Sequence, residues 1–188
     1  DRVIVIGQGT AAVAGEAVAA AFEWALHGAD VQERKSTATE LSGFGLDADM
    51  SSTLVVAISQ SGTTTDTNRT VDLARSRGAV VLAIVNRRGS DLVDKSDGVL
   101  YTSDGRDVEM SVAATKAFYA QIAAGFLLAI GVAEIQPGAE GGGAERQSLL
   151  RSLRALPDAM RTTIAKQEEI GVAAARHAPS RRYWAMVG

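Results

Sequence analysis

Short apolar runs alternate with longer amphipathic segments over the first two thirds of the chain. The runs are rich in Val, Ile and Leu, are bounded by Gly, Asn or Ser, and span residues 3–6, 54–58 and 80–85. Continuous apolar runs of this length are typical of strands that are buried on both faces of a parallel sheet. Two weaker strand candidates span residues 29–33 and 98–102.

Helical spacing fills the segments between these runs. The predicted helices span residues 12–27, 64–77 and 113–131, and a short one starts at Ser90. A glycine follows each of the first two, at the position where helices commonly end. The alternation predicts an α/β fold: a three-layer αβα sandwich around a mostly parallel sheet of about five strands, of the flavodoxin-like or Rossmann-like kind.

The last third of the chain has a different sequence composition. Residues 136–147 contain a proline and three consecutive glycines, which predicts a flexible connection. Two further helices are predicted at 148–154 and 157–175, with Pro157 in a first helical turn. Residues 183–187 have the composition of a strand, which we expect to pair with the sheet or with another chain. Both ends of the chain look cut, so we expect a piece of a longer protein.

The composition is that of a globular domain. The 188 residues correspond to one domain with a tail, at roughly 150 residues per domain. Hydrophobic residues make up 46% and charged residues 22%, which excludes a mainly disordered chain. With 19 basic and 22 acidic residues the net charge is −3, so we expect neither nucleic acid nor a membrane as a partner. The most apolar stretch, residues 122–135, is too short to span a bilayer.

Cysteine is absent, and the two histidines, His27 and His177, lie far apart in sequence. These facts exclude disulfides, thiolate nucleophiles and metal centres rich in Cys or His. We therefore expect no metal and no cofactor. The lack of cysteine also fits a cytoplasmic protein.

Four loops follow the predicted strands, at the edge of a parallel sheet where ligands bind. They comprise residues 7–12, 59–65, 86–90 and 109–116. The second carries five hydroxyl side chains in seven residues: Ser59, Ser61, Thr63, Thr64 and Thr65. Gly62 permits a close approach of the backbone, and the start of the next helix favours an anion. This loop predicts a phosphate cradle, with a Ser/Thr-rich helix cap as the alternative.

The first loop has a weak dinucleotide-binding pattern. Gly7 and Gly9 are followed by Ala12, which meets the glycine pattern only in its loosest form, and Glu33 is the formal candidate for the ribose-binding acid. A tight strand-to-helix turn is the alternative.

Two charged residues have two interpretations each. Glu23 is a candidate base if it faces inward and is otherwise an ordinary solvated side chain. Lys116 either reaches an anionic ligand or covers apolar surface with its stem.

Several spaced segments resemble the SIS domain, the sugar isomerase fold that binds phosphosugars. The main one is Ser59-Gln60-Ser61-Gly62-Thr63-Thr64-Thr65-Asp66-Thr67. The supporting ones are Gly9-Thr10, Thr39-Glu40-Leu41, Asn86 with Gly89-Ser90-x-Leu92, and residues 112–118. Their order and spacing are similar to the first SIS half of glutamine–fructose-6-phosphate aminotransferases (glucosamine-6-phosphate synthases) and of related two-SIS phosphosugar isomerases. The resemblance implies an SIS domain over residues 1–135, a Gly-rich linker with helices over 136–180, and the first strand of a second SIS domain at 181–188.

The resemblance also implies a phosphosugar pocket. The phosphate-binding positions of the family motif match Ser59, Gln60, Ser61 and Thr64, while Thr10 lines the pocket and Val112 contacts the sugar through its backbone. The full implied set is Gly9, Thr10, Ser59, Gln60, Ser61, Gly62, Thr64 and Val112. The chain departs from the family pattern at Gln8, Ala11, Thr63 and Ala114, where members usually have Cys, Ser, Glu and Ser.

The groups that such enzymes use for acid–base, Schiff-base and ring-opening chemistry match no position in this chain, so the catalytic residues stay unknown. We expect the chain to bind a hexose phosphate such as fructose 6-phosphate or glucosamine 6-phosphate, and to be inactive alone. The resemblance implies aldose–ketose isomerisation by the longer protein, and a homodimer. The alternatives are a regulatory domain that senses a sugar phosphate without catalysis, and a nucleotide-binding oxidoreductase module based on Gly7-x-Gly9.

Overall fold

The computed structural model describes residues 1–103, 116–140, 143–180, 183 and 185. The chain divides into two units, Asp1–Gly143 and Ala144–Gly188, which are described separately. Every buried residue in the described part of the chain belongs to the first unit.

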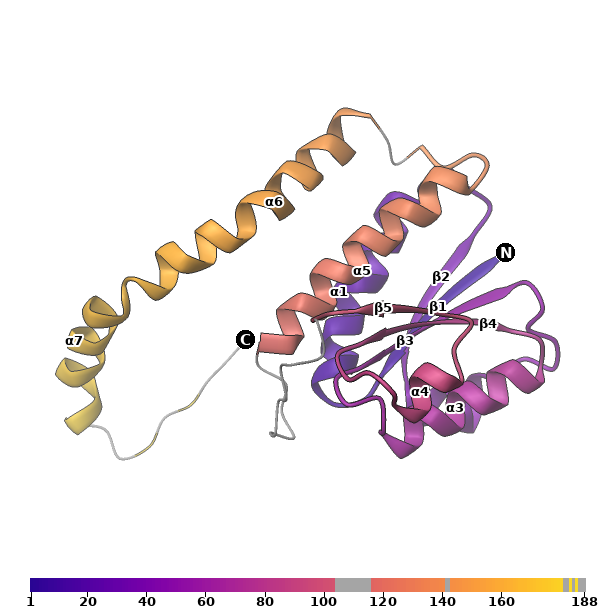
Figure 1. Ribbon diagram of the computed structural model, residues 1–188, viewed down its shortest axis with the longest axis horizontal. Coiled ribbons are helices and arrows are strands. Elements are labelled where there is room, and N and C mark those ends of the chain that lie inside the picture. The colour runs from indigo at the N-terminus through magenta and orange to yellow at the C-terminus, as the bar shows by residue number, and fades with distance from the viewer. Residues whose placement is uncertain (104–115, 141–142, 181–182, 184, 186–188) are drawn as a thin grey trace. The chain divides into compact units, whose positions relative to one another are not determined.

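Five parallel strands form one sheet in the order β2-β1-β3-β4-β5 (Figure 1). The strands are β1 (Arg2–Gly7), β2 (Gln32–Thr37), β3 (Thr53–Ser59), β4 (Val80–Val85) and β5 (Gly98–Tyr101). This is the flavodoxin-like order, in which the chain steps to one side of β1 and then continues on the other side. The predicted α/β class with a five-stranded parallel sheet is confirmed.

Helices cover both faces of the sheet and complete the three layers (Figure 1). One face carries α1 (Thr10–Ala25) and α5 (Lys116–Ile135), and the other carries α2 (Ala38–Glu40), the π-helical turn η1 (Leu41–Gly45), α3 (Thr65–Ser76) and α4 (Asp91–Asp94). Alternate side chains of a strand serve the two layers: Val3 and Val5 join the cluster of α1, whereas Ile4 and Ile6 join that of α3. Both faces of the sheet are covered, so the central strands contain continuous apolar runs. Such runs are the sequence pattern that predicts these strands.

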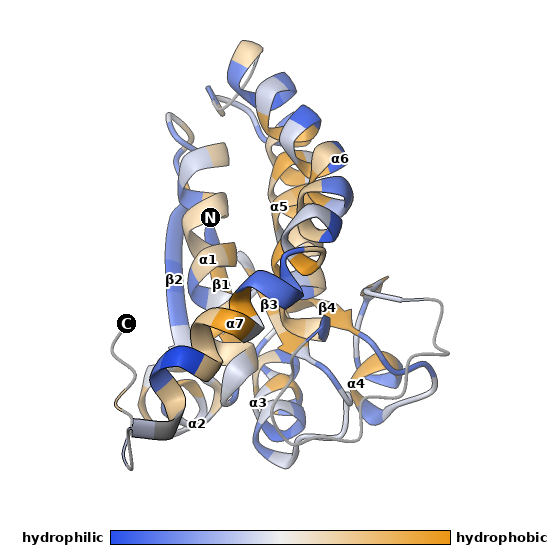
Figure 2. Cartoon of the chain, turned by 90° about the vertical axis from the view of Figure 1, so that its left-hand side faces the viewer, coloured by the Kyte–Doolittle hydropathy of each residue, from blue (hydrophilic) through white to orange (hydrophobic). Residues whose placement is uncertain are grey.

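The strand predicted at residues 29–33 is wrong in position. β2 is Gln32–Thr37, reads Gln-Glu-Arg-Lys-Ser-Thr and is hydrophilic along its length (Figure 2). It lies at the edge of the sheet and pairs with β1 alone. Its side chains are polar, so it carries no apolar run that a sequence pattern can detect.

The helix α5 packs closely on α1. A Cβ atom on Gly125 would lie 2.2 Å from Cγ2 of Val18, so the two helices approach through a glycine. The 20 residues of α5 are long and apolar enough, by length and composition alone, to cross a membrane. The apolar stretch at 122–135 lies within this longer helix, which begins at Lys116. In this structure α5 contacts α1 and β4.

The second unit consists of α6 (Ala144–Ile164), α7 (Gln167–His177) and the 3-10 turn η2 (Ala178–Ser180). The predicted helix start at Pro157 is wrong, because Pro157 lies inside α6 and the two helices divide after Ile164. A proline inside a helix removes one backbone hydrogen bond and clashes with the preceding turn, which usually kinks the helix. The predicted strand at residues 181–188 falls largely outside the described residues.

Candidate anion-binding site

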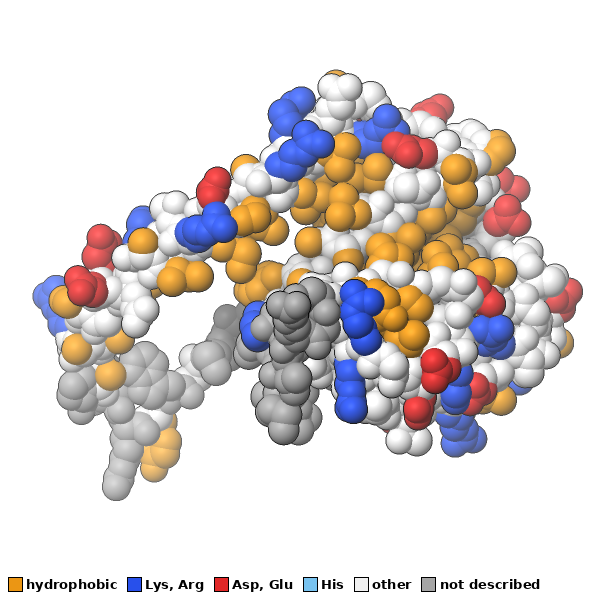
Figure 3. Space-filling view, in the orientation of Figure 1, with side chains coloured by type: hydrophobic (Ala, Val, Ile, Leu, Met, Phe, Trp, Pro, Cys, Tyr) orange, Lys and Arg blue, Asp and Glu red, His pale blue; other side chains and the backbone are white. Residues whose placement is uncertain are grey.

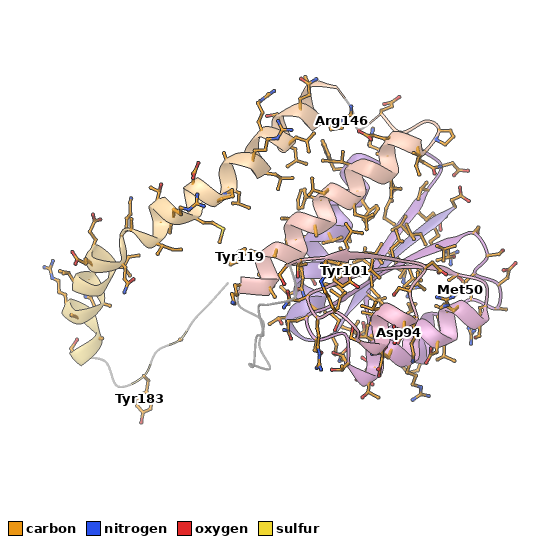
Figure 4. The ribbon with its side chains drawn as sticks, viewed as in Figure 1. Met50, Asp94, Tyr101, Tyr119, Arg146 and Tyr183 are labelled. Carbon is orange, nitrogen blue, oxygen red and sulfur yellow. The ribbon has the colours of Figure 1, made fainter. Side chains whose placement is uncertain are left out.

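Three loops leave neighbouring strands at the carboxyl edge of the sheet. We call them the first loop (residues 7–10), the hydroxyl loop (59–64) and the arginine loop (86–90); they follow β1, β3 and β4. The order of the sheet reverses between β1 and β3, and doubly wound folds bind their ligands at such a switch point. In Figure 4, Tyr101 marks this edge of the sheet and Met50 marks the opposite edge.

The hydroxyl loop folds back on its own side chains. Oγ of Ser59 accepts a hydrogen bond from the backbone N–H of Gly62 at 3.0 Å and lies 3.5 Å from Oγ1 of Thr64. Oγ of Ser61 accepts two hydrogen bonds from Thr63, one from its N–H at 3.2 Å and one from its hydroxyl at 3.0 Å. Since Ser61 accepts both bonds, its own hydroxyl proton remains available to a ligand.

Gly62 brings the hydroxyl loop against the arginine loop. Its φ is +68°, and a Cβ atom there would lie 2.0 Å from Oγ of Ser90. Ser90 is buried, and the carbonyl of Gly62 accepts a hydrogen bond from the N–H of Leu92 at 3.0 Å. Only glycine combines this backbone conformation with this close contact.

Asn68 supports the hydroxyl loop through two hydrogen bonds. Its side-chain amide donates to the carbonyls of Gly62 and Thr64, both at 3.1 Å, and the residue is buried. Asn68 is not among the residues predicted from the sequence. Its position four residues after Thr64 is the available signal, because one helical turn returns a side chain to the start of its helix.

The start of α3 points at the same place. Thr64 is the N-cap residue of α3, yet its side chain makes no capping hydrogen bond. The first intrahelical bond runs from the N–H of Asn68 to the carbonyl of Thr64 at 3.0 Å, so the N–H groups of the preceding turn have no acceptor within the helix. The interpretation of the loop as a mere helix cap is therefore not supported, and the helix end stays available to an anion.

The arginine loop carries two basic residues, Arg87 and Arg88, at the same edge of the sheet. The N–H groups of Asn86 and Arg87 both lie 3.3 Å from the carbonyl of Gln60, which joins the two loops. The guanidinium of Arg88 lies 4.2 Å from the centre of the Tyr101 ring. On the face shown in Figure 3, acidic and basic side chains are otherwise interspersed over this unit. The charge at this edge is local and does not make a broad basic surface.

The first loop is a tight strand-to-helix turn. Gly9 has a φ of +59°, and its carbonyl accepts hydrogen bonds from the N–H groups of Ala12 and Val13. The acid proposed for dinucleotide binding is not at this edge, since Glu33 is the second residue of β2 and pairs with Val3 near the amino end of the sheet. Glu33 therefore cannot bind a ribose at the first loop, and the dinucleotide interpretation fails.

The remaining candidates are spread more widely. The side chain of Glu23 is exposed on α1, which rules out the inward-facing base. Lys116 is the exposed first residue of α5. Thr10 begins α1 beside Gly9. Val112 lies outside the described residues.

The strand order and the position of the hydroxyl loop define a doubly wound α/β domain with a Ser/Thr-rich loop at its switch point. The family model for the SIS domain matches residues 1–131. The chain belongs to the SIS domain family, as its motifs indicate.

Individual relatives agree with this assignment. The chain is 43% identical over 129 residues to a glutamine–fructose-6-phosphate aminotransferase of Mycolicibacterium smegmatis, covering 69% of this chain and 20% of that protein. It is 39% identical over 174 residues to the enzyme of the same name from Corynebacterium glutamicum, covering 90% of this chain and 26% of that protein. The chain thus spans only about a fifth to a quarter of the length of these curated relatives.

Solved structures show the same fold. The C-terminal domain of glucosamine-fructose-6-phosphate aminotransferase from Francisella tularensis superposes with a TM-score of 0.78 at 25% identity, covering 92% of this chain and 47% of that one. A glucosamine-6-phosphate deaminase from Thermotoga maritima superposes with a TM-score of 0.62 at 23% identity, covering 84% of this chain and 45% of that one.

Proposed function

We propose that this domain binds the phosphate group of a hexose phosphate at the hydroxyl loop, within a longer phosphosugar isomerase or glutamine–fructose-6-phosphate aminotransferase. The observation that carries the proposal is the junction of the hydroxyl loop with α3, where Thr64 leaves the helix end uncapped. The relatives support the choice of substrate class. The contacting residues we propose are Gly9, Thr10, Ser59, Gln60, Ser61, Gly62, Thr64 and Val112.

The loop supplies what a phosphate needs. Phosphate oxygens only accept hydrogen bonds, so the site must offer donors. The hydroxyl of Ser61 keeps its proton for a ligand. The hydroxyls of Ser59 and Thr64 are in contact, so one of them donates to the other and the second proton is left for a ligand. The N-terminus of α3 adds backbone N–H groups and a favourable dipole. Binding therefore requires little rearrangement of the loop.

Catalysis requires groups beyond this chain in our proposal. Aldose–ketose isomerisation moves a proton between adjacent carbons and needs a base within hydrogen-bond reach. Glu23, the candidate base from the sequence, is exposed on α1 and does not face inward. We therefore propose that the chain binds its ligand without turnover, and that the longer protein is cytoplasmic and homodimeric.

Titration calorimetry on the full chain tests the proposal. We expect fructose 6-phosphate and glucosamine 6-phosphate to bind and unphosphorylated fructose not to bind. The double variant Ser61→Ala with Thr64→Val should lose at least about tenfold in affinity, since two hydrogen bonds to a charged group are removed. Ser76→Ala is the matched control, because its hydroxyl caps a carbonyl at the far end of α3. Unchanged affinity in the double variant contradicts the assigned cradle.

A further inference from the structure

Unsatisfied polar atoms gather at the carboxyl edge of the sheet. Within the described residues, the buried side-chain atoms without a hydrogen-bond partner are Oε1 of Gln8, Oγ1 of Thr67, Oδ1 of Asn68, and both Nε2 and Oε1 of Gln121. Gln8 follows β1, Thr67 and Asn68 lie in the first turn of α3, and Gln121 lies in the second turn of α5. Buried polar groups are normally paired, so each of these atoms requires an explanation.

Gln121 is the most extreme of the four. Its side chain is fully buried, and neither amide atom has a partner. An apolar side chain of similar size would avoid the desolvation of this amide. Gln121 therefore needs a hydrogen-bond partner that the described contacts do not supply.

The helix geometry directs this amide toward the first loop. α1 and α5 run side by side in the same direction (Figure 1), and Gly125 of α5 meets Val18 of α1. One turn earlier on both helices, Gln121 comes level with Ala14, which has no side-chain atoms beyond Cβ. Long side chains in helices lean toward the helix N-terminus. For Gln121 that direction is the carboxyl edge of the sheet, where the first loop precedes α1.

The first loop holds a complementary group. Oε1 of Gln8 is a buried acceptor without a partner, and a glutamine amide offers two N–H donors. We propose that Gln121 is a positioning residue, whose amide donates to Gln8 in the ligand-bound form and fixes the first loop so that Gly9 and Thr10 meet the sugar. This inference rests on the proposed phosphosugar site and deepens it. It separates the site into a phosphate end at the hydroxyl loop and a sugar end at the first loop.

Calorimetry on the full chain with fructose 6-phosphate and with inorganic phosphate tests the inference. Gln121→Met keeps the length of the side chain and removes its hydrogen bonds; Gln8→Met makes the corresponding change in the loop, away from the core. We expect each variant to bind fructose 6-phosphate about three- to tenfold more weakly and inorganic phosphate unchanged. The double variant should lose no more than either single one, because both substitutions remove the same bond.

Thermal unfolding without ligand separates positioning from a structural role. Gln121→Met should unfold at the same temperature as the parent or higher, while the control Gln32→Met, at the amino end of β2, should change neither unfolding nor affinity. If the parent chain binds fructose 6-phosphate but Gln121→Met binds it equally well, or if the two losses multiply in the double variant, the inference is overturned and the proposed function stands. If the parent chain does not bind fructose 6-phosphate, the proposed function fails and this inference fails with it.

Discussion

Gly62 joins the hydroxyl loop to the arginine loop through a single close contact. A Cβ atom there would lie 2.0 Å from Oγ of the buried Ser90, and the φ of +68° disfavours any other residue. We predict that Gly62→Ala lowers the free energy of unfolding by about 2 kcal/mol or more, because left-handed strain adds to overpacking. Equilibrium unfolding in urea measures the loss.

Gly43→Ala is the matched control for this prediction. An added Cβ on Gly43 meets nothing within 4 Å, and the φ of Gly43 is not positive. We expect a change within about 0.5 kcal/mol, as for other open positions. Equal losses in the two variants would mean that the contact with Ser90 has no effect on stability.

Asn68 provides a second test at the scale of single residues. Its amide holds the carbonyls of Gly62 and Thr64, both at 3.1 Å. Asn68→Leu keeps the approximate size and removes both bonds, so the unfolding free energy should fall by about 1–3 kcal/mol. Phosphate affinity should fall as well, because the loop loses its support. A calorimetric titration with phosphate that matches the parent chain would show that the loop keeps its shape without Asn68.

The hydroxyl residues of the loop could be predicted, whereas the contacts that support the loop could not. Ser59, Ser61 and Thr64 are adjacent in sequence, and their spacing alone indicates a loop rich in hydroxyls. Gly62 meets Ser90 only because the fold brings two distant segments together. A local pattern contains no information about such contacts.

At the scale of elements, the packing of α5 on α1 depends on one glycine. A Cβ on Gly125 would meet Val18 at 2.2 Å, whereas one on Gly131 of the same helix would meet nothing within 4 Å. We predict that Gly125→Ala destabilises the protein by about 1–3 kcal/mol through overpacking. Gly131→Ala should stabilise it by up to about 1 kcal/mol through helix propensity. Urea unfolding of both variants measures the difference, and equal signs would contradict the close approach of the two helices.

Elements with apolar positions at the period of the element could be predicted, whereas the polar strand β2 could not. The strand predicted at residues 80–85 matches β4 (Val80–Val85), and the helix predicted at 12–27 is α1, shifted by two residues. Both contribute to the buried core, so their apolar positions follow the period of the element. The position of β2 could not be predicted, because its sequence is polar and its place in the sheet follows from its pairing with β1.

At the scale of the whole molecule, the topology brings together the three loops of the candidate site. The three loops are separated by tens of residues in sequence and become neighbours only because β1, β3 and β4 are adjacent in the sheet. The α/β class follows from the alternation of strands and helices, and the strand order then places the carboxyl ends together. The sequence pattern predicted the first of these, and the structure supplied the second.

The buried core of the chain lies in the first unit. The sheet, both core clusters and the three loops lie within residues 1–143, whereas no described residue of α6 or α7 is buried. We predict that a chain ending at Gly143 folds and binds fructose 6-phosphate as the full chain does. Its unfolding temperature should lie within about 3 °C of that of the full chain, which for a domain of this size corresponds to roughly 1 kcal/mol.

Residues 144–188 alone are the counterpart of this experiment. A helix without a packed face is marginal in water, so circular dichroism of this segment should show only partial helix. A cooperative unfolding transition in the isolated segment would contradict the prediction, as would a large loss of stability on its removal from the full chain. The first result would mean that residues 144–188 fold on their own, and the second that the stability of residues 1–143 depends on them.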